Sequence, residues 1–420
     1  MTALRPPVPL EQHVSRRRSN LLAPFSYRGF RLLWTGLIIS NLGTWMQFTT
    51  LGYLVVVLAG SPARAALDVG ILGASSAIPV VLLSPLAGHV ADSYPRRRVL
   101  LLTNGTQIAI ALCLAILSTF HLLTIYEIFA LSGLRSTTQA FDAPARQSWA
   151  PLLVPRELLG NAIGLNSIAF NAPSVIGPPI AGVLILYVGI SVSFYVNALA
   201  TCAVVVALLL MAPSPPSSTS REGALASIVA GLRYLAGHAV LRSIILLLVA
   251  TCLLVRPYAQ LLPAYAVHVV HVDARGLGLL LAASGVGAIG GSLVTAIVGA
   301  RRRGVVWFSS AVVMALGVVV LGLVHDFLVA LAVLGVLGCA TLSFAGSTNV
   351  LLQMLAPEDM RGRAISVFSM VILGLVPAGS LLLGSFAAIV TLPVAFVWSG
   401  ALAVVVAVSI FAGSPGLRDV

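Results

Sequence analysis

Ionisable side chains are scarce in this sequence, and those inside long apolar segments are the residues most able to do chemistry. Arg135 lies deep in such a segment, with Gln139 one helical turn and Asp142 two turns further along nearly the same face of a helix. A charge at that depth in a membrane costs several kcal/mol, so Arg135 must face protein or a water-filled cavity and pair with another group. We expect these residues to bind a substrate or to take part in a protonation step.

Further polar residues could serve the same purpose, each with an alternative. Glu127, nearer the outer end of the segment, could carry a proton if burial favoured its protonated form, or could be solvated at the membrane surface. Arg256 could line a cavity for an anionic or polar substrate, or extend towards the outer surface. Asn41 and Gln47 belong to a polar stripe with three-residue spacing, which could face a cavity or make hydrogen bonds between helices.

Enzyme chemistry has no support in this sequence. It contains no phosphate-binding loop of the form G-x-x-x-x-G-K-[ST], so ATP is not expected to drive the protein. The seven histidines are scattered, and no carboxylate or histidine cluster has catalytic or metal-ligand spacing. The four cysteines lie singly in apolar runs, which is typical of small buried side chains. We expect neither a cofactor nor a metal.

The composition is that of a membrane protein. Of the 420 residues, 59% are hydrophobic and 9% are charged, whereas soluble domains carry roughly 25% charged residues. The formal net charge is +12, but the arginines are spread between apolar runs and form no basic face, so nucleic acid is not an expected partner. These numbers exclude a soluble globular domain and a disordered chain, and make the lipid bilayer the expected surrounding.

Twelve apolar segments are long enough to cross a bilayer as helices. A Pro/Ser-rich segment at 213–223, typical of a flexible linker, separates them into two sets of six and is followed by an amphipathic segment. We expect an all-α polytopic membrane protein with six-helix bundles at 32–212 and 241–412, a cytoplasmic linker with an amphipathic helix at 213–240, and cytoplasmic tails at 1–31 and 413–420. The predicted spans are 32–58, 68–91, 98–120, 122–142, 161–187, 190–212, 241–263, 276–299, 304–324, 327–348, 365–390 and 393–412.

Arginine positions predict the orientation, and an internal repeat predicts the architecture. With both chain ends in the cytoplasm, 20 of the 24 basic residues fall in cytoplasmic segments, as the positive-inside rule requires. At an offset of 202 positions, Gly177 pairs with Gly379 and Gly182 with Gly384. Parallel repeats related by an axis along the membrane normal characterise a large class of transporters. They argue against a membrane-bound enzyme or sensor.

The loop between the second and third predicted spans carries Gly88, Asp92, Arg96 and Arg97. A glycine at a helix end permits close backbone approach, and Asp92 can pair with an arginine or cap a helix, which would make a latch on the cytoplasmic face. The segment resembles the G-x-x-x-D-R-x-G-R-R signature of the major facilitator superfamily. It departs from that signature at positions 93 and 95, where serine and proline replace arginine and glycine.

The fifth predicted span carries Gly164, Gly177, Pro178 and Gly182. Small residues three or four apart let another helix backbone approach closely, and a proline bends the helix. The pattern resembles the antiporter signature of the same superfamily, g-x8-G-x3-G-P-x2-G-G, and this resemblance implies proton-coupled export. A packing face of small residues unrelated to the direction of transport is the alternative.

Leu131 and Arg135 resemble a third signature of the superfamily, l-x-x-x-R-x-x-q-G. Other segments, such as 141–147, resemble its bacterial enterobactin-exporter-like and macrolide-efflux-like branch, and the resemblance covers nearly the whole chain. It implies a secondary active transporter in the bacterial plasma membrane that exports a drug, siderophore or secondary metabolite by alternating access, with protons as the coupling ion. An importer of a small nutrient is the alternative within the superfamily.

Overall fold

The computed structural model describes residues 22–149, 153–211, 224–298 and 303–413, and every regular element in these ranges is helical. Two short 3-10 turns occur at Ala23–Ser26 and Arg156–Leu158. The helices are α1 (Arg28–Leu58), α2 (Pro62–Ser93), α3 (Arg96–Thr119), α4 (Ile125–Trp149), α5 (Leu159–Tyr187), α6 (Ile190–Leu210), α7 (Ala224–Gly237), α8 (Ala239–Leu254), α9 (Tyr258–His268), α10 (Ala274–Ile297), α11 (Arg303–Leu323), α12 (Phe327–Leu355), α13 (Glu358–Ile389) and α14 (Leu392–Ala412).

Twelve helical stretches in the described part of the chain correspond to the twelve predicted spans. Ten of them are long and apolar enough to cross a membrane by length and composition. The other two, α1 and α4, are more polar, since α1 carries Asn41 and Gln47 and α4 carries four charged residues. A polar stripe is tolerated in such a helix because it faces the protein interior rather than lipid. The fold class predicted from sequence is confirmed.

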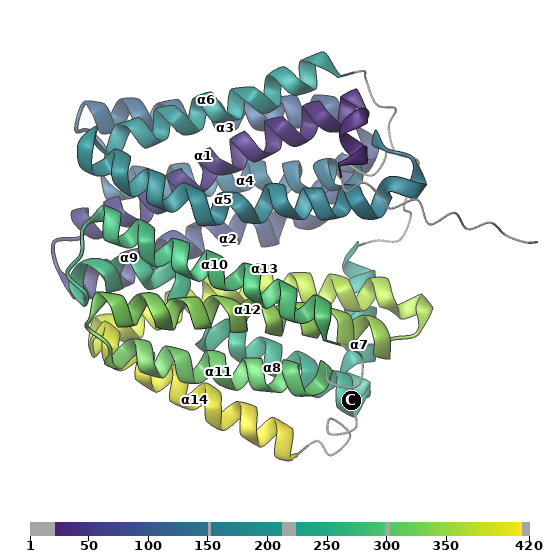
Figure 1. The fold of residues 1–420 in the computed structure, drawn as a ribbon, viewed down its shortest axis with the longest axis vertical. Coiled ribbons are helices and arrows are strands. Elements are labelled where there is room, and N and C mark those ends of the chain that lie inside the picture. The colour runs from purple at the N-terminus through teal and green to yellow at the C-terminus, as the bar shows by residue number, and fades with distance from the viewer. Residues whose placement is uncertain (1–21, 150–152, 212–223, 299–302, 414–420) are drawn as a thin grey trace, which may run out of the picture.

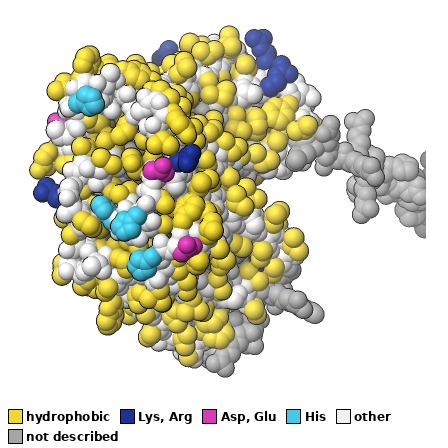
Figure 2. Space-filling model, turned by 60° about the vertical axis from the view of Figure 1, so that its left-hand side comes forward, with side chains coloured by type: hydrophobic (Ala, Val, Ile, Leu, Met, Phe, Trp, Pro, Cys, Tyr) yellow, Lys and Arg dark blue, Asp and Glu magenta, His cyan; other side chains and the backbone are white. Residues whose placement is uncertain are grey.

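The helices form two bundles that lie side by side in Figure 1, with α1–α6 above and α8–α14 below. Because the chain crosses back and forth, its connections gather at two opposite ends of the molecule. We name them the arginine-rich end, with the connections after α2, α4, α10 and α12, and the arginine-poor end, with those after α1, α3, α5, α9, α11 and α13. Figure 2 shows a surface dominated by hydrophobic side chains, with histidines and a few charged groups, as expected for a protein surrounded by lipid.

Several helices extend beyond the apolar spans that predicted them. For example, α1 begins at Arg28 instead of position 32, and α2 begins at Pro62 instead of position 68. Ser61 caps α2 by accepting a hydrogen bond from the backbone N–H of Arg64, and Pro62 fits the first helical position. Hydropathy therefore marks the thickness of the apolar layer, whereas capping residues mark where a helix begins.

The seventh predicted span is two helices rather than one. Helix α8 ends at Leu254 and α9 begins at Tyr258, so the break contains Arg256 and Pro257. Proline has no N–H and its ring crowds the preceding turn, which interrupts the helical hydrogen bonds.

The predicted linker at 213–223 lies outside the described residues. The amphipathic segment after it forms α7, whose Leu235 is buried in the core of the C-terminal bundle.

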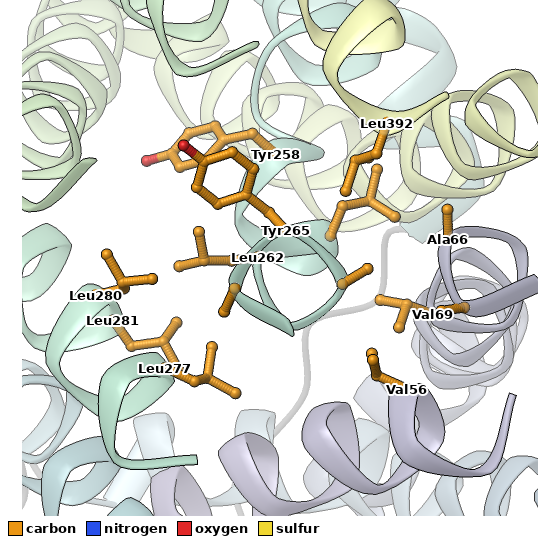
Figure 3. Close-up of a cluster of buried hydrophobic side chains, with 14 of the residues drawn as sticks. Val56, Ala66, Val69, Tyr258, Leu262, Tyr265, Leu277, Leu280, Leu281 and Leu392 are labelled. Atoms are coloured by element: carbon orange, nitrogen blue, oxygen red, sulfur yellow. The ribbon is translucent and has the colours of Figure 1, made fainter. Parts of the chain in front are cut away.

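One hydrophobic core joins the two bundles, and it lies towards the arginine-poor end. Figure 3 shows α9 at its centre, with Tyr258, Leu262 and Tyr265 between side chains of α10 and those of α1 and α2. The other clusters in the described residues each belong to a single bundle and lie towards the arginine-rich end. The bundles are therefore sealed together at one end and packed separately at the other.

Glycines bring helix backbones into contact across this seal. A Cβ atom at Gly70 of α2 would lie 2.7 Å from the carbonyl oxygen of Ser380 on α13, and one at Gly384 would lie 2.5 Å from that of Ala66. Helices α5 and α10 meet in the same way at Gly278, where a Cβ would lie 2.5 Å from the carbonyl oxygen of Pro178. Two pairs of helices, α2 with α13 and α5 with α10, therefore bring backbones of the two bundles into close contact.

The closest helix contact within one bundle joins α10 and α12, and it yields a stability prediction. A Cβ at Gly338 would overlap the carbonyl oxygen of Ser284, so we expect Gly338→Ala to cost about 1 to 3 kcal/mol through overpacking and to lower the melting temperature in detergent. Gly105→Ala on α3 is the matched control, because nothing lies within 4 Å of a Cβ there. Equal melting temperatures for the two variants would contradict the contact.

Candidate substrate cavity

A cavity of about 240 Å³ lies near the middle of the helices and is bounded mainly by the N-terminal bundle. Its walls combine apolar and aromatic side chains with hydroxyl and amide groups, and Arg135 is the one charged residue among the lining residues described. The lining residues are Thr44, Trp45, Phe48 and Leu51 of α1, Leu72, Gly73 and Ser76 of α2, Ser132, Arg135, Ser136 and Gln139 of α4, and Gln260 of α9.

Helix periodicity explains how these residues reach one place. Positions 132, 135, 136 and 139 of α4 follow the spacing of a single helix face, and so do Leu72 and Ser76 of α2. Gln260 enters from the second bundle one turn after the break between α8 and α9. The cavity is therefore a contact region of both bundles, although the first bundle supplies most of its polar groups.

Arg135 is the principal binding group that the cavity offers. Within the described residues, its guanidinium has neither an ion pair nor a side-chain hydrogen bond. The predicted neighbour Gln139 lines the same cavity, so the sequence spacing brings these two residues together as expected. An arginine with five donors and no protein partner can bind an incoming acceptor in two-pronged geometry.

Asp142 does not pair with Arg135, contrary to the expectation from spacing. It is 4% exposed and accepts hydrogen bonds from Thr103 Oγ1 at 3.0 Å and Asn104 Nδ2 at 2.8 Å, both on α3. It also forms a close ion pair with Arg146, one turn further along α4. Asp142 lies about 10 Å further along the axis of α4 than Arg135, where this helix face meets α3, so this acid joins α3 to α4 instead.

Glu127 lies at the start of α4, where it caps the helix. Its carboxylate accepts a hydrogen bond from the backbone N–H of Thr124 at 3.0 Å and a close one from the hydroxyl of the same residue. A threonine followed three residues later by a glutamate is the capping-box arrangement. The solvated alternative for Glu127 therefore agrees with the structure, and the buried proton carrier does not.

Some residues of the polar stripe of α1 make hydrogen bonds to other helices, and others line the cavity. Asn41 donates to the carbonyl oxygen of Ala169 on α5 at 2.9 Å, and fully buried Gln47 makes a close hydrogen bond with Asn197 of α6. Thr44, between them, lines the cavity. For Asn41 and Gln47 the helix-to-helix alternative is the one the structure contains.

Arg256 lies half-buried in the break between α8 and α9 and is not among the residues that line the cavity. Its Nη1 atom is enclosed and has no hydrogen-bond partner in the described residues. The side chain therefore does not extend freely to the outer surface. Its neighbours include Cys252 and Tyr258 of the C-terminal bundle.

The latch residues are described only in part. Gly88 and Asp92 lie in the last turns of α2, but their side chains are outside the described ones. Arg96 is 5% exposed at the start of α3, and Arg97 Nη2 donates to the carbonyl oxygen of Leu209 on α6 at 2.9 Å. The two arginines thus lie against the N-terminal bundle at the arginine-rich end.

The predicted antiporter residues of α5 lie in three different surroundings. A Cβ at Gly177 would lie 2.8 Å from the Cβ of Trp45, so α5 packs tightly on the cavity wall of α1. Gly182 and Pro178 contact α10 of the other bundle. Gly164 faces open space, with nothing within 4 Å of a Cβ. The pattern therefore combines one contact within a bundle and two between bundles.

Several cavity residues were missed from the sequence. Ser132 and Ser136 share the helix face of Arg135, and their spacing would have identified them. Trp45 and Phe48 carry no such signal, because aromatic residues are ordinary in membrane helices. Gln260 follows Arg256 by one turn, and only the break between α8 and α9 explains why Gln260 and not Arg256 reaches the cavity.

Two six-helix membrane bundles around a central cavity define a secondary transporter of the major facilitator type. Residues 19–415 match the family described as transmembrane secretion effector, and the chain belongs to this family of the major facilitator superfamily. It is a multi-pass membrane transporter and not an enzyme. The family and the transport role predicted from sequence are confirmed.

Curated relatives cover most of the chain at low identity. The multidrug efflux pump Tap of Mycolicibacterium fortuitum is 25% identical over 361 residues, which is 83% of this chain and 87% of the pump. The enterobactin exporter EntS of Citrobacter koseri is 28% identical over 382 residues, 90% of this chain and 89% of that exporter. Both are similar to this chain over nearly their whole length.

Solved structures agree on the fold. The D-xylose-proton symporter has a TM-score of 0.73 at 15% identity and covers 94% of this chain and 99% of its own. The nucleoside transporter NupG has the same TM-score and identity and covers 91% and 98%. At this level of identity the similarity concerns the fold alone.

The buried Asp142 cluster yields a second stability prediction. Asp142→Ala removes the ion-pair partner of largely enclosed Arg146 and one acceptor of buried Asn104, so we expect a loss of about 3 to 5 kcal/mol in the free energy of unfolding. Glu358→Ala is the control, since Glu358 is 92% exposed and lies 3.9 Å from Arg361, a pair worth about 0 to 1 kcal/mol. Similar thermal stability of both variants in detergent would contradict the role assigned to Asp142.

Proposed function

We propose that this protein is a proton-driven exporter of small amphipathic molecules that carry a negative charge. The observation that carries the proposal is Arg135, an unpaired cation in a cavity whose described lining holds no carboxylate. Among the drugs, siderophores and secondary metabolites expected from sequence, the substrates are then those with an anionic group or a strong hydrogen-bond acceptor.

The chemistry of the cavity supports this class of substrate. A guanidinium removed from water loses its hydrogen bonds to water molecules. A carboxylate, phosphate or phenolate replaces them best, because each forms charge-assisted hydrogen bonds with the guanidinium. Trp45 and Phe48 offer aromatic surface beside it, and Gln139 and Gln260 offer amide groups. An aromatic compound with a negative group would match both parts of the lining.

The distribution of packing supports the direction of transport. By sequence, 20 of the 24 arginines fall in segments that the positive-inside rule assigns to the cytoplasm together with both chain termini, and this assigns the arginine-rich end to the cytoplasm. The core that joins the bundles lies at the opposite end. A carrier sealed outside and packed as separate bundles inside is ready to load from the cytoplasm. Export also agrees with the similarity to the efflux pump Tap and the exporter EntS.

The signature motifs have roles in this cycle. Gly177 lets α5 close on α1, while Pro178 and Gly182 let it slide on α10 as the bundles rock. The segment from Gly88 to Arg97, where α2 ends and α3 begins, acts as a cytoplasmic latch that releases and re-forms in each cycle. The resemblance of α5 to the antiporter signature supports protons as the counter-ion.

The charge preference can be measured with two fluorescent probes. Cells that express the protein should accumulate less fluorescein, an anion, and this difference should vanish with an uncoupler, whereas accumulation of ethidium, a cation, should change little. Arg135→Ala should abolish fluorescein export and Arg135→Lys should restore part of it, because an ammonium lacks the planar fork of arginine. Wild-type export per inserted molecule in Arg135→Ala would exclude the binding role.

Orientation gives a separate prediction. In a variant whose four cysteines are replaced by serine, a new cysteine at Ser93 should resist an impermeant maleimide added to intact cells and react once the cells are opened. A cysteine at Leu122, which is exposed between α3 and α4, should react from outside. The opposite pattern of labelling would reverse the proposed topology and the direction inferred from it.

A further inference from the structure

We propose that Asp68 is the carboxyl group that binds the driving proton, and that it takes up this proton from the arginine-poor end of the molecule. The inference rests on the proposed proton-driven export and adds the residue that carries the proton. Asp68 lies in α2, within a stretch that could span a membrane, and is 5% exposed. The sequence had not singled it out, because it stands at the edge of an apolar span.

The other acidic side chains in the described residues each have a structural or surface role. Some cap the first turn of a helix, some lie exposed, and one is buried and fully paired. These are Asp273, Asp326 and Glu127 as caps, Glu157 and Glu358 as exposed residues, and Asp142 as the paired one.

Asp68 differs from all of these in having almost no compensation for its burial. Its Oδ2 atom is enclosed and has no hydrogen bond. Its partner in the described residues is Arg64, whose Nε lies 3.6 Å away and whose side chain is 62% exposed. An ion pair of this length to an exposed arginine contributes little, while an ionised carboxylate removed from water without hydrogen bonds is strongly disfavoured. The site can therefore accept a neutral acid, as a proton carrier requires.

Asp68 lies on α2 between the arginine-poor end of the molecule and the cavity. Asp68, Leu72 and Ser76 follow one another at four-residue spacing on one face of α2, and the latter two line the cavity. At 1.5 Å per residue, Asp68 lies about 6 Å beyond Leu72 along the axis of the helix, towards the arginine-poor end. Exposed Arg64 lies one turn further out. The proton site thus stands between the outer surface and the site of Arg135.

The same segment of α2 takes part in the seal between the bundles. Ala66 and Gly70, on either side of Asp68, touch the backbone of α13 at Gly384 and Ser380. This contact must separate when the carrier opens at the arginine-poor end. A change of charge at Asp68 would therefore act next to a contact that alternates during transport.

Few ionisable groups near this end of α2 compete with Asp68. The helices packed against it bring Tyr53 on α1, Glu127 on α4 and His268 on α9, while residues 380–392 of α13 and α14 carry no ionisable side chain. The pocket beside Pro62 also contains His271 and His325. Of the charged groups described, Arg64 is the one that acts on the Asp68 carboxylate.

Infrared difference spectroscopy of the full-length protein in liposomes tests the proposal directly. Lowering the pH should produce the C=O stretching band of a protonated, buried carboxylic acid, and this band should be missing in Asp68→Asn and retained in Glu127→Gln. Arg64→Gln, a change at an exposed side chain, should let the band persist to higher pH, because the charge that favours the ionised carboxylate is gone. A band unchanged in Asp68→Asn, or indifferent to Arg64→Gln, would overturn the assignment.

Transport in the same liposomes separates this inference from the proposed function. Wild-type protein should move fluorescein against its gradient when a proton gradient is imposed, whereas Asp68→Asn should only equilibrate it. Gradient-driven accumulation by Asp68→Asn would overturn the proton site while leaving export intact. Failure of the wild type to move fluorescein at all would count against the proposed function, and the infrared result would still decide the protonation of Asp68.

Discussion

Helices in a bilayer must satisfy their own backbone hydrogen bonds, and they gain little from burying apolar side chains against one another, because lipid is equally apolar. Close backbone contact at glycines therefore holds this protein together. Gly338 fixes α10 to α12 inside one bundle, and Gly70, Gly278 and Gly384 hold the two bundles against each other. The glycine contacts between the two bundles lie towards the arginine-poor end, where the shared hydrophobic core also lies. The same interaction that stabilises the molecule thus determines which end can open.

Contacts between different helices determine the partners of the polar residues that the sequence could not assign. Hydropathy located twelve helical stretches, ten of which are apolar enough to cross a membrane, and helix spacing brought Arg135 and Gln139 to one cavity, because both depend only on positions along a single helix. Asp142 could not be assigned this way, since its partners Thr103 and Asn104 come from a different helix. The uses of Asn41 and Gln47 depend on how α1 is rotated against α5 and α6, which no local pattern specifies.

Buried polar residues of the N-terminal bundle fall into two groups with different consequences. Some, such as Asp142 and Gln47, bond to a neighbouring helix and so join α4 to α3 and α1 to α6. Two charged residues, Arg135 and Asp68, have no such bond to a neighbouring helix among the described residues, and they lie on or just outside the cavity. A charge enclosed without a partner is costly to the fold, and two such groups on or beside one cavity indicate that the cavity binds a ligand.

The unpaired charge of Arg135 also makes the empty carrier sensitive to voltage. Water in the open half of a rocking carrier places the cavity at the electrical potential of that side, so in the proposed cycle Arg135 passes from the potential of the cytoplasm to that of the exterior. Against an interior-negative membrane this transfer costs about 2.3 kcal/mol per 100 mV. The resting potential therefore holds the empty carrier open to the cytoplasm, and a bound monoanion cancels that cost by neutralising the guanidinium.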